Sequence, residues 1–358
     1  MPNDVLTHAI DAVASRRDLS VQEAERVLDE IMHGEVSETQ IAGFLIALRT
    51  KGETVDELAG LARAMRALAA PVATAREDLL DTAGTGGGRR TFNVSTTAAL
   101  IAAAAGCAVA KHGNRSATGL SGSADLLEAL GARIDLSPSA VATCIEEVGF
   151  GFMFAPAHHQ ATRFVIPVRH DLAVRTIFNL LGPLTNPAGA GRQLIGVSDA
   201  SFLERMAGAL AMLGVDRALV VAGEDGLDEV SASAGTKVVE VNGEQISRYV
   251  ITPQEVGIEL EPGSSAAQGP PGGTPQENAA VTRAILESGE AGVGAGAPAG
   301  AALAVINAGA AIYAAGGADT IADGVQAARA ALADGSGAAA LERYVQASRR
   351  HAPAQAQR

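Results

Sequence analysis

Residues 81–88 read Asp-Thr-Ala-Gly-Thr-Gly-Gly-Gly, so four of the five positions from Gly84 to Gly88 are glycine. A strand-like segment at 79–82 precedes this run, and a helical pattern reaching Ala105 follows it. Glycines let backbone amides approach a ligand, and helix N-termini stabilise anions. The stretch therefore predicts an α/β fold with an anion-binding loop, although a tight structural turn explains a glycine loop alone almost equally well.

The loop matches neither common nucleotide-binding fingerprint. Arg89 stands where the dinucleotide motif requires its last glycine, and the Gly-Lys-Ser/Thr ending of a P-loop is missing. Together with the cation, imidazole, amide and guanidinium within 111–115, the loop predicts a site for a phosphorylated, sugar-bearing ligand.

Strand-like and helical segments alternate along the rest of the chain. We expect strands at 79–82, 108–111, 134–136, 150–154, 193–197 and 217–221, and helices at 124–130, from Pro138, and at 201–213. Asn242-Gly243 between apolar segments predicts a hairpin. The fold class is α/β, with a mostly parallel central sheet in a large domain at 73–350, loops at 262–275 and 288–300, and a frayed tail at 351–358.

The first 72 residues are predicted to form a small helical domain. Three helix starts fit capping boxes, namely Ser20 with Glu23, Ser37 with Gln40, and Thr54 with Glu57. Gly34 and Gly52 end the first two helices. Three short helices carry more apolar surface than they can bury alone. We expect helices from about 160–190 to join them, and the bundle to form the interface of a homodimer.

Composition and charge limit the classes of partner that the chain can bind. The 358 residues carry a net charge of -13, which argues against nucleic acid as a partner. Cys107 and Cys144 are expected to be buried, reduced thiols. The chain begins without a secretory signal pattern, and its apolar runs are too short to span a membrane. We expect a cytoplasmic protein that binds a small anionic molecule and no membrane.

Two polar clusters follow predicted strands. Asn93, Ser95 and Thr96 open the helix after the glycine loop. Thr91 or Asn93 alone could serve as a cap, but three such residues beside a glycine loop favour ligand binding. Residues 111–116 read Lys-His-Gly-Asn-Arg-Ser and follow the next strand, at the end where α/β sheets bind ligands. Lys111 and Arg115 can pair with phosphate oxygens. A flexible polar run continues to Ser123.

Acidic and basic residues further along supply other candidates. Asp228-Glu229 follows an apolar strand, and Mg²⁺ typically takes one or two protein carboxylates. Solvated loop acids are the simpler explanation, and Glu224 and Asp225 are rivals. In 163–175, one of Arg163, Arg169, His170 and Arg175 could hold a carboxylate.

In this order the pieces resemble the anthranilate phosphoribosyltransferase family of nucleoside-phosphorylase-like transferases. The specific motifs are Lys-His-Gly-Asn-Arg at 111–115 and Arg-Thr-Ile-Phe-Asn-Leu-Leu-Gly-Pro-Leu-Thr-Asn-Pro at 175–187. The resemblance runs from Gln40-Ile41-Ala42 to Gln276-Glu277-Asn278-Ala279, nearly the whole chain. It implies transfer of a phosphoribosyl group from 5-phosphoribosyl 1-pyrophosphate (PRPP) to anthranilate in tryptophan biosynthesis.

The resemblance also implies roles for individual residues. Lys111, Asp228 and Glu229 would serve catalysis, and Ser95, Asp228 and Glu229 would bind Mg²⁺, with two ions per site. Anthranilate would contact Gly84, His112, Asn114 and Arg169. PRPP would contact Gly84, Gly87, Gly88, Thr91, Asn93, Val94, Ser95, Thr96, Lys111, His112, Gly113, Asn114, Arg115, Ser116, Ala117, Thr118, Gly119 and Ser123.

Two departures from the family pattern stand out. The commoner loop is Gly-Thr-Gly-Gly-Asp-Gly, whereas here the Asp is missing and the loop is one residue shorter. The usual Ser-Ser is Thr118-Gly119, with Leu120 where Lys is common. We expect both departures to tune binding rather than abolish it.

The implied reaction displaces pyrophosphate from C1 of the ribose by the neutral aromatic amine. Orienting two substrates supplies roughly 7–11 kcal/mol, more than the about 10²–10⁴-fold of an acid–base group, so positioning and charge neutralisation should dominate. Three alternatives stay open: a pyrimidine nucleoside phosphorylase, a non-catalytic paralogue that binds nucleic acid or protein, and transfer to another aromatic amine.

Overall fold

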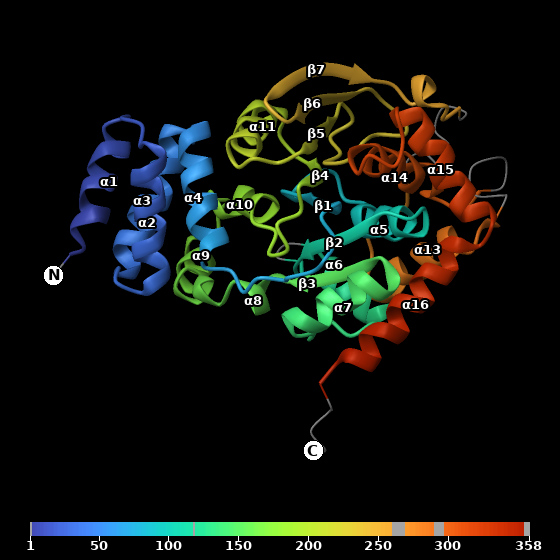
Figure 1. Cartoon of the computed structure of the whole chain (residues 1–358). Helices are drawn as coiled ribbons and strands as arrows, with labels where there is room; N and C mark the ends of the chain where they lie inside the picture. The colour runs from blue at the N-terminus through green and yellow to red at the C-terminus, as the bar shows by residue number, and fades with distance from the viewer. Residues whose placement is uncertain (1, 117–118, 260–268, 290–296, 354–358) are drawn as a thin grey trace.

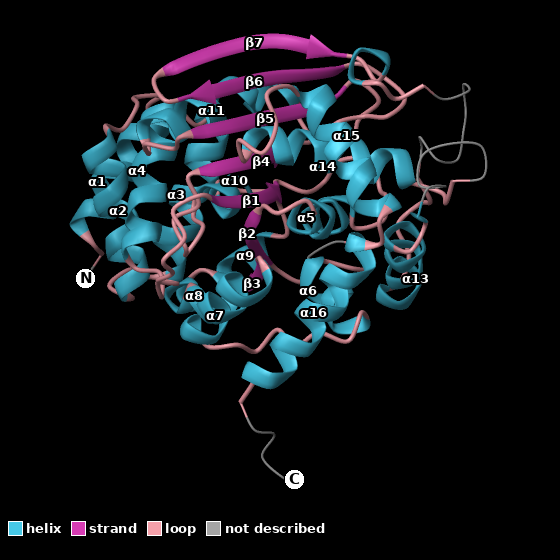
Figure 2. Ribbon diagram, turned by 45° about the vertical axis from the view of Figure 1, so that its right-hand side comes forward, coloured by secondary structure: helices cyan, strands magenta, loops and turns pink. Residues whose placement is uncertain are grey.

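The computed structural model describes residues 2–116, 119–259, 269–289 and 297–353 (Figure 1). Its centre is a seven-stranded sheet in the order β3-β2-β1-β4-β5-β6-β7 (Figure 2). The strands are β1 (Leu79–Gly84), β2 (Ala108–Gly113), β3 (Phe150–Phe154), β4 (Arg192–Gly196), β5 (Arg217–Gly223), β6 (Thr236–Asn242) and β7 (Gln245–Ile251). β1 to β5 pair in parallel, and β6 and β7 are antiparallel, so both the mostly parallel sheet and the hairpin are confirmed.

The strand order places a topological switch point at the glycine loop. The chain builds outward from β1 to β2 and β3, then returns to add β4 on the other side of β1. Ligands of open α/β sheets bind outside the carboxyl ends of the strands at such a point. Gly84 ends β1, and its register partner Gly196 ends β4. The fold thus puts the loop where a ligand is expected.

Two apolar cores lie on the two faces of the sheet. One joins the sheet to α5, α7, α13, α14, α15 and α16, and the other joins it to the N-terminal helices, α10 and α11. These helices are α5 (Val94–Ala104), α7 (Pro138–Val148), α10 (Phe178–Leu184), α11 (Leu203–Met212), α13 (Pro275–Leu286), α14 (Ala301–Ala314), α15 (Ile321–Ala333) and α16 (Ser336–His351). Shorter helices are α6 (Ser123–Ala129), α8 (Ala155–His158), α9 (Ile166–Leu172), η1 (Gln160–Phe164), η2 (Ala200–Phe202) and η3 (Gln254–Val256).

The N-terminal bundle has four helices, one more than the capping signals predicted: α1 (Asp4–Ala14), α2 (Val21–His33), α3 (Glu38–Lys51) and α4 (Val55–Ala67). The Ser20 and Thr54 capping boxes are present. At α3 Ser37 caps the helix, but Gln40 does not complete a box. Its side chain instead pairs with the Asn3 backbone at the start of α1, accepting from N and donating to O, both at 3.0 Å.

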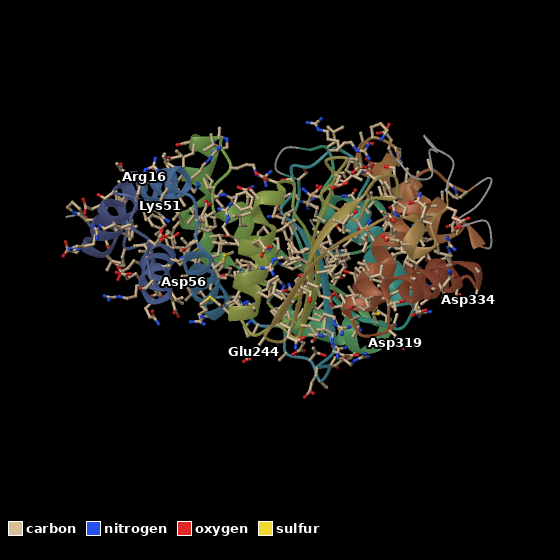
Figure 3. The ribbon with its side chains drawn as sticks, turned by 90° about the horizontal axis from the view of Figure 1, so that it is seen from above. Arg16, Lys51, Asp56, Glu244, Asp319 and Asp334 are labelled. Atoms are coloured by element: carbon tan, nitrogen blue, oxygen red, sulfur yellow. The ribbon has the colours of Figure 1, made fainter. Side chains whose placement is uncertain are left out.

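A buried ion pair holds the bundle together. Glu57 is fully buried, and its carboxylate accepts from the Leu19 amide at 3.0 Å and from Lys51 Nζ at 3.0 Å. Lys51 also donates to Asp18 at 2.6 Å. Figure 3 shows Lys51 and Asp56 in the bundle, at the far end of the molecule from Asp334. A buried charge needs such partners, so this cluster serves the fold of the bundle.

The predicted strand at 134–136 is wrong. Residues 132–137 have neither helix nor strand, and β3 pairs directly with β2. Ile134 and Leu136 are buried, which produced the alternating pattern, but the segment pairs with no strand of the sheet. Within the described residues, no helix is long and apolar enough to cross a membrane.

Asn186, from the 175–187 motif, ties β1 to β2. Its Nδ2 donates to Asp81 Oδ2 and to the Ala110 carbonyl, both at 2.8 Å, and its Oδ1 accepts from the Ala188 amide at 2.9 Å. Asp81 also accepts from the His112 amide at 3.1 Å. Burial raises the pKa of Asp81 to about 6, against the opposing attraction of Lys111. The motif thus fixes the two strands that carry the glycine loop and Lys111.

Replacing Asn186 with alanine should lower the free energy of unfolding by about 3 kcal/mol or more, because the buried Asp81 carboxylate and Ala110 carbonyl each lose a donor. Urea denaturation checks this. Gln160→Ala, at an exposed position, is the control and should leave stability unchanged. A loss below 1 kcal/mol would show that water replaces the amide and that Asn186 does not hold the strands.

Candidate active site

The glycine loop lies at the carboxyl end of β1 against two other loops. The Thr85 amide donates to the Gly196 carbonyl at 2.9 Å, and the Arg89 amide donates to the Gly226 carbonyl at 2.7 Å. Gly86 and Gly87 have positive φ of 62° and 89°, which favour glycine. The loop is therefore held beside the 223–229 segment, which carries the acidic pair.

Asp228 lies directly against the glycine loop. A Cβ on Gly88 would collide with Asp228 Oδ1 at 2.5 Å, whereas one on Gly84 would make an ordinary contact with Oδ2 at 3.6 Å. A Cβ on Gly196 would overlap the Asp228 carbonyl. These glycines let a carboxylate lie directly against the glycine loop, an arrangement that would repel a bare phosphate and would suit a metal-complexed one.

The electrostatics of Asp228 and Glu229 also favour a bound cation. Burial raises the pKa of Asp228, with Arg175 and the Gly86 amide opposing the shift. Burial and the neighbouring Asp228 charge raise the pKa of Glu229 well above its usual value, against Lys111 and the Ser95 amide. Two carboxylates that lack full compensation are a suitable partner for a divalent cation.

Lys111 reaches this group from β2. Its side chain is buried, and Nζ donates to the Thr82 carbonyl, to Thr82 Oγ1 at 3.1 Å and to Ser95 Oγ at 3.5 Å. Burial lowers the pKa of Lys111 to about 8, against the attraction of Asp81 and Glu229. The glycine loop, Ser95, Lys111 and the acidic pair therefore meet on one side of the sheet, as the sequence predicted.

The polar residues at the start of α5 have mixed surroundings. Asn93 is the N-cap residue, but its side chain makes no capping bond. Its Oδ1 accepts from Asn278 Nδ2 at 2.8 Å and Ser121 Oγ at 3.1 Å, so it joins α13 to the 121 loop. Val94 is buried. The hydroxyls of Thr91 and Thr96 are buried without a described partner.

The segment from Gly113 to Ser123 folds onto the start of α6. Arg115 Nη1 lies 2.6 Å from both Asp125 and Glu128, so its guanidinium is neutralised rather than directed at the glycine loop. Asp125 also accepts from the Ser116 amide at 3.2 Å, and Ser116 Oγ accepts from Gly119 N at 2.7 Å. Asn114 Oδ1 accepts from the Arg115 amide at 2.7 Å. Gly113 and Ser123 adjoin, with a Cβ on Gly113 3.1 Å from that of Ser123, while Ala117 and Thr118 lie outside the described residues.

His112 and Arg169 lie near the N-terminal bundle side of the sheet. His112 Nδ1 lies 3.2 Å from the Gly182 carbonyl and must donate to it, whereas Nε2 is buried without a described partner. Burial lowers the pKa of His112 to about 3, so the ring is neutral and Nε2 is a free acceptor. Arg169 is half-buried, 5.4 Å from the Phe178 ring centroid. Burial lowers the pKa of Arg169 too.

Two residues of the site, Thr82 and Gly196, were not predicted from the sequence, and a third, Arg175, was not distinguished from its neighbours. Thr82 supplies two acceptors to Lys111, Gly196 makes room for Asp228, and the Arg175 side chain lies against Gly87. Gly196 lies at the carboxyl end of the strand predicted at 193–197, which was an available signal. Arg175 was one of four similar candidates, and nothing in their spacing distinguished it.

The oxygen donors present fit a magnesium ion. The described residues contain no group of three or more His, Cys, Asp or Glu side chains able to hold a metal alone. Asp228, Glu229 and the Ser95 hydroxyl offer oxygen only, and burial raises the pKa of both acids, so a bound cation would stabilise their charged forms. Mg²⁺ commonly keeps such a partial protein shell and takes the rest from phosphate and water.

The chain matches known transferases over almost its whole length. Residues 7–69 match the helical bundle domain, and residues 76–339 the a/b domain, of a glycosyl transferase family. An anthranilate phosphoribosyltransferase of Rubrobacter xylanophilus is 51% identical over 289 residues, 80% of this chain and 83% of that protein. The chain therefore belongs to the anthranilate phosphoribosyltransferase family.

Two solved structures agree with the fold. Anthranilate phosphoribosyltransferase from Thermus thermophilus superposes with a TM-score of 0.86 at 46% identity, covering 95% of this chain and 99% of that one. The Saccharomyces cerevisiae enzyme, solved in complex with PRPP and Mg, gives a TM-score of 0.84 at 26% identity, covering 96% and 98%.

Proposed function

We propose that this chain transfers the phosphoribosyl group of PRPP to the amine of anthranilate, releasing pyrophosphate, in tryptophan biosynthesis. The chain's membership of the family supports this proposal. The structural observation that carries it is the position of Asp228 against the glycine loop, so close that a Cβ added to Gly88 would lie 2.5 Å from Asp228 Oδ1. An acid at a diphosphate-binding loop is useful when a cation lies between them.

We assign a separate role in this reaction to each group of residues in the site. Amides of the glycine loop and of the α5 start would hold the phosphates, with Thr91, Asn93, Ser95 and Thr96 beside them. Asp228, Glu229 and Ser95 would hold Mg²⁺, two ions per site, which supplies positive charge to the leaving pyrophosphate. Lys111 adds a fixed buried cation to the same region. Positioning and charge neutralisation then carry the reaction, without a strong base.

Loss of anthranilate fluorescence tests the activity. In a mixture of the purified chain, PRPP, magnesium and anthranilate, the anthranilate fluorescence should fall with time. Omitting the chain, PRPP or magnesium should prevent this fall. Steady fluorescence in the complete mixture, with the chain shown to be folded, would overturn the proposal. Replacing anthranilate by other aromatic amines tests which acceptor the enzyme uses.

Replacing Arg169 with alanine should raise KM for anthranilate by about tenfold to a hundredfold with a smaller change in KM for PRPP. A half-buried guanidinium can hold the acceptor carboxylate by charge-assisted bonds worth about 1.5–3 kcal/mol. Steady-state kinetics with each substrate varied measures this. The exposed His170, replaced by alanine, is the control. Equal changes in both KM values would remove Arg169 from the acceptor site.

We further propose a homodimer formed through the helical domain, with the domain division at residue 72, and a place in the cytoplasm. Ile46 of α3 is an exposed apolar residue of the bundle, and Cys107 and Cys144 are free, as expected in a reducing compartment. Light scattering of the full chain should give twice the 36.1 kDa of the monomer.

A further inference from the structure

Arg175 connects the two loops that flank the topological switch point. It lies between α9 and α10, and its Nη1 donates to Ser198 Oγ at 2.9 Å while Nη2 donates to the Thr85 carbonyl at 3.4 Å. Thr85 follows β1 and Ser198 lies just beyond β4. One planar guanidinium therefore bridges the glycine loop and the neighbouring strand end.

The glycine loop is shaped to receive this side chain. A Cβ on Gly87 would collide with Arg175 Nη1 and lie 3.1 Å from Cζ. Gly87 also has a φ of 89°, which favours glycine, and a larger residue there would displace the end of the arginine side chain. A second bond fixes the same loop, because Ser198 N donates to Thr85 Oγ1 at 3.3 Å.

Arg175 also acts on the acidic pair and contacts the helical bundle. Its charge opposes the rise in the pKa of Asp228, so the guanidinium lies within electrostatic reach of that carboxylate. On the other side, Arg49 Nη1 of α3 donates to the Arg175 carbonyl at 2.8 Å. A continuous set of hydrogen bonds thus runs from the bundle through Arg175 to the glycine loop.

We propose that Arg175 is a positioning residue for phosphoribosyl transfer. It braces the Thr85 carbonyl against the end of β4, so that the amides of residues 86–88 face the diphosphate, and Arg49 sets its position relative to the bundle. The inference rests on the proposed function for its catalytic consequence but not for its structural one. Lysine cannot replace the arginine, because an ammonium lacks the planar fork that reaches two acceptors on separate loops.

Kinetics with Arg175→Lys and Arg175→Ala tests the catalytic part. Both should raise KM for PRPP by about tenfold to a hundredfold, the equivalent of a hydrogen bond to a charged group, with anthranilate KM and thermal midpoint nearly unchanged. Arg163→Lys is the matched control, since that arginine is exposed and stacks on Phe164 at 4.7 Å. A wild-type KM for PRPP in Arg175→Lys would overturn the bridging role.

A ligand-free measurement separates this inference from the proposed function. Hydrogen exchange of a peptide covering 84–92 should be faster in Arg175→Ala than in the wild type and unchanged in Arg163→Lys. If the wild type proves inactive, the proposed function fails while this result still decides whether Arg175 braces the loop. Equal exchange in Arg175→Ala and wild type overturns the inference even if the enzyme is active.

A double-mutant cycle tests the contact with Gly87. Gly87→Ala should raise KM for PRPP more in the wild-type background than in Arg175→Ala, because the new methyl group has nothing to displace once the arginine is gone. The remaining effect reports the strain of alanine at positive φ. Additive effects would show that the two residues act independently and would contradict the contact.

Discussion

Replacing Asp228 by asparagine together with Glu229 by glutamine is expected to lower kcat/KM for PRPP by roughly a thousandfold or more. Removing one preorganised electrostatic group from an active site typically costs about 10²–10³ in rate, and here both proposed carboxylate ligands of the metal are lost. Amides keep the shape of the side chains but not their charge, so raising the magnesium concentration should not restore activity. Near-normal turnover at saturating magnesium would refute the metal assignment.

The same double substitution should not lower stability. The pKa values of Asp228 and Glu229 are raised, mainly by burial, so their charged forms are unfavourable in the folded chain. The neutral amides should therefore unfold at an equal or higher temperature than the wild type at pH 7. Glu224→Gln is the control in the same loop, since Glu224 is exposed and was a rival candidate. A comparable loss of activity in that variant would shift the metal site toward Glu224.

Local signals predicted the fold well where a single segment carries the information. Ser20 and Glu23 specify the start of α2 by themselves, and both halves of that capping box form. The segment 134–136 shows the limit, because apolar alternation records which side chains are buried but not whether the backbone pairs with a strand. Gln40 shows the same limit, since its partner Asn3 lies 37 residues away.

The site was predictable where strand topology brings residues together. Parallel strands end at one edge, so Gly84, Lys111 and Asp228 were expected to meet, and they do. Arg115 was expected to face phosphate, but Asp125 and Glu128 lie 10 and 13 residues further on along a helix that turns toward it. Its role in binding PRPP stays a prediction. A motif gives the residue types of a site but not the competing partners of each side chain.

Replacing Lys111 by methionine should lower kcat/KM for PRPP by about a hundredfold to a thousandfold, since it deletes the buried cation beside Ser95 and the acidic pair. Methionine has a similar length and no charge. Lys51→Met in the bundle is a poor control because it leaves Glu57 unpaired, whereas Lys237→Met removes an exposed lysine of β6 and should change little.

The pH dependence supplies a sharper test of the same lysine. Burial lowers the pKa of Lys111 to about 8 from 10.5, so kcat/KM for PRPP should fall as the pH rises through 8. Lys111→Met should not show this fall.

The contribution of Lys111 to stability should change with pH in the opposite direction. Between pH 8 and 10.5 the unfolded chain holds a proton on this lysine that the folded chain has released, so the lysine's contribution to the free energy of unfolding rises with pH. Subtracting the Lys111→Met unfolding curve from that of the wild type isolates this contribution. If neither this difference nor kcat/KM for PRPP changed with pH, Lys111 would stay charged over the whole range. Its pairing with the acids would then outweigh the effect of its burial.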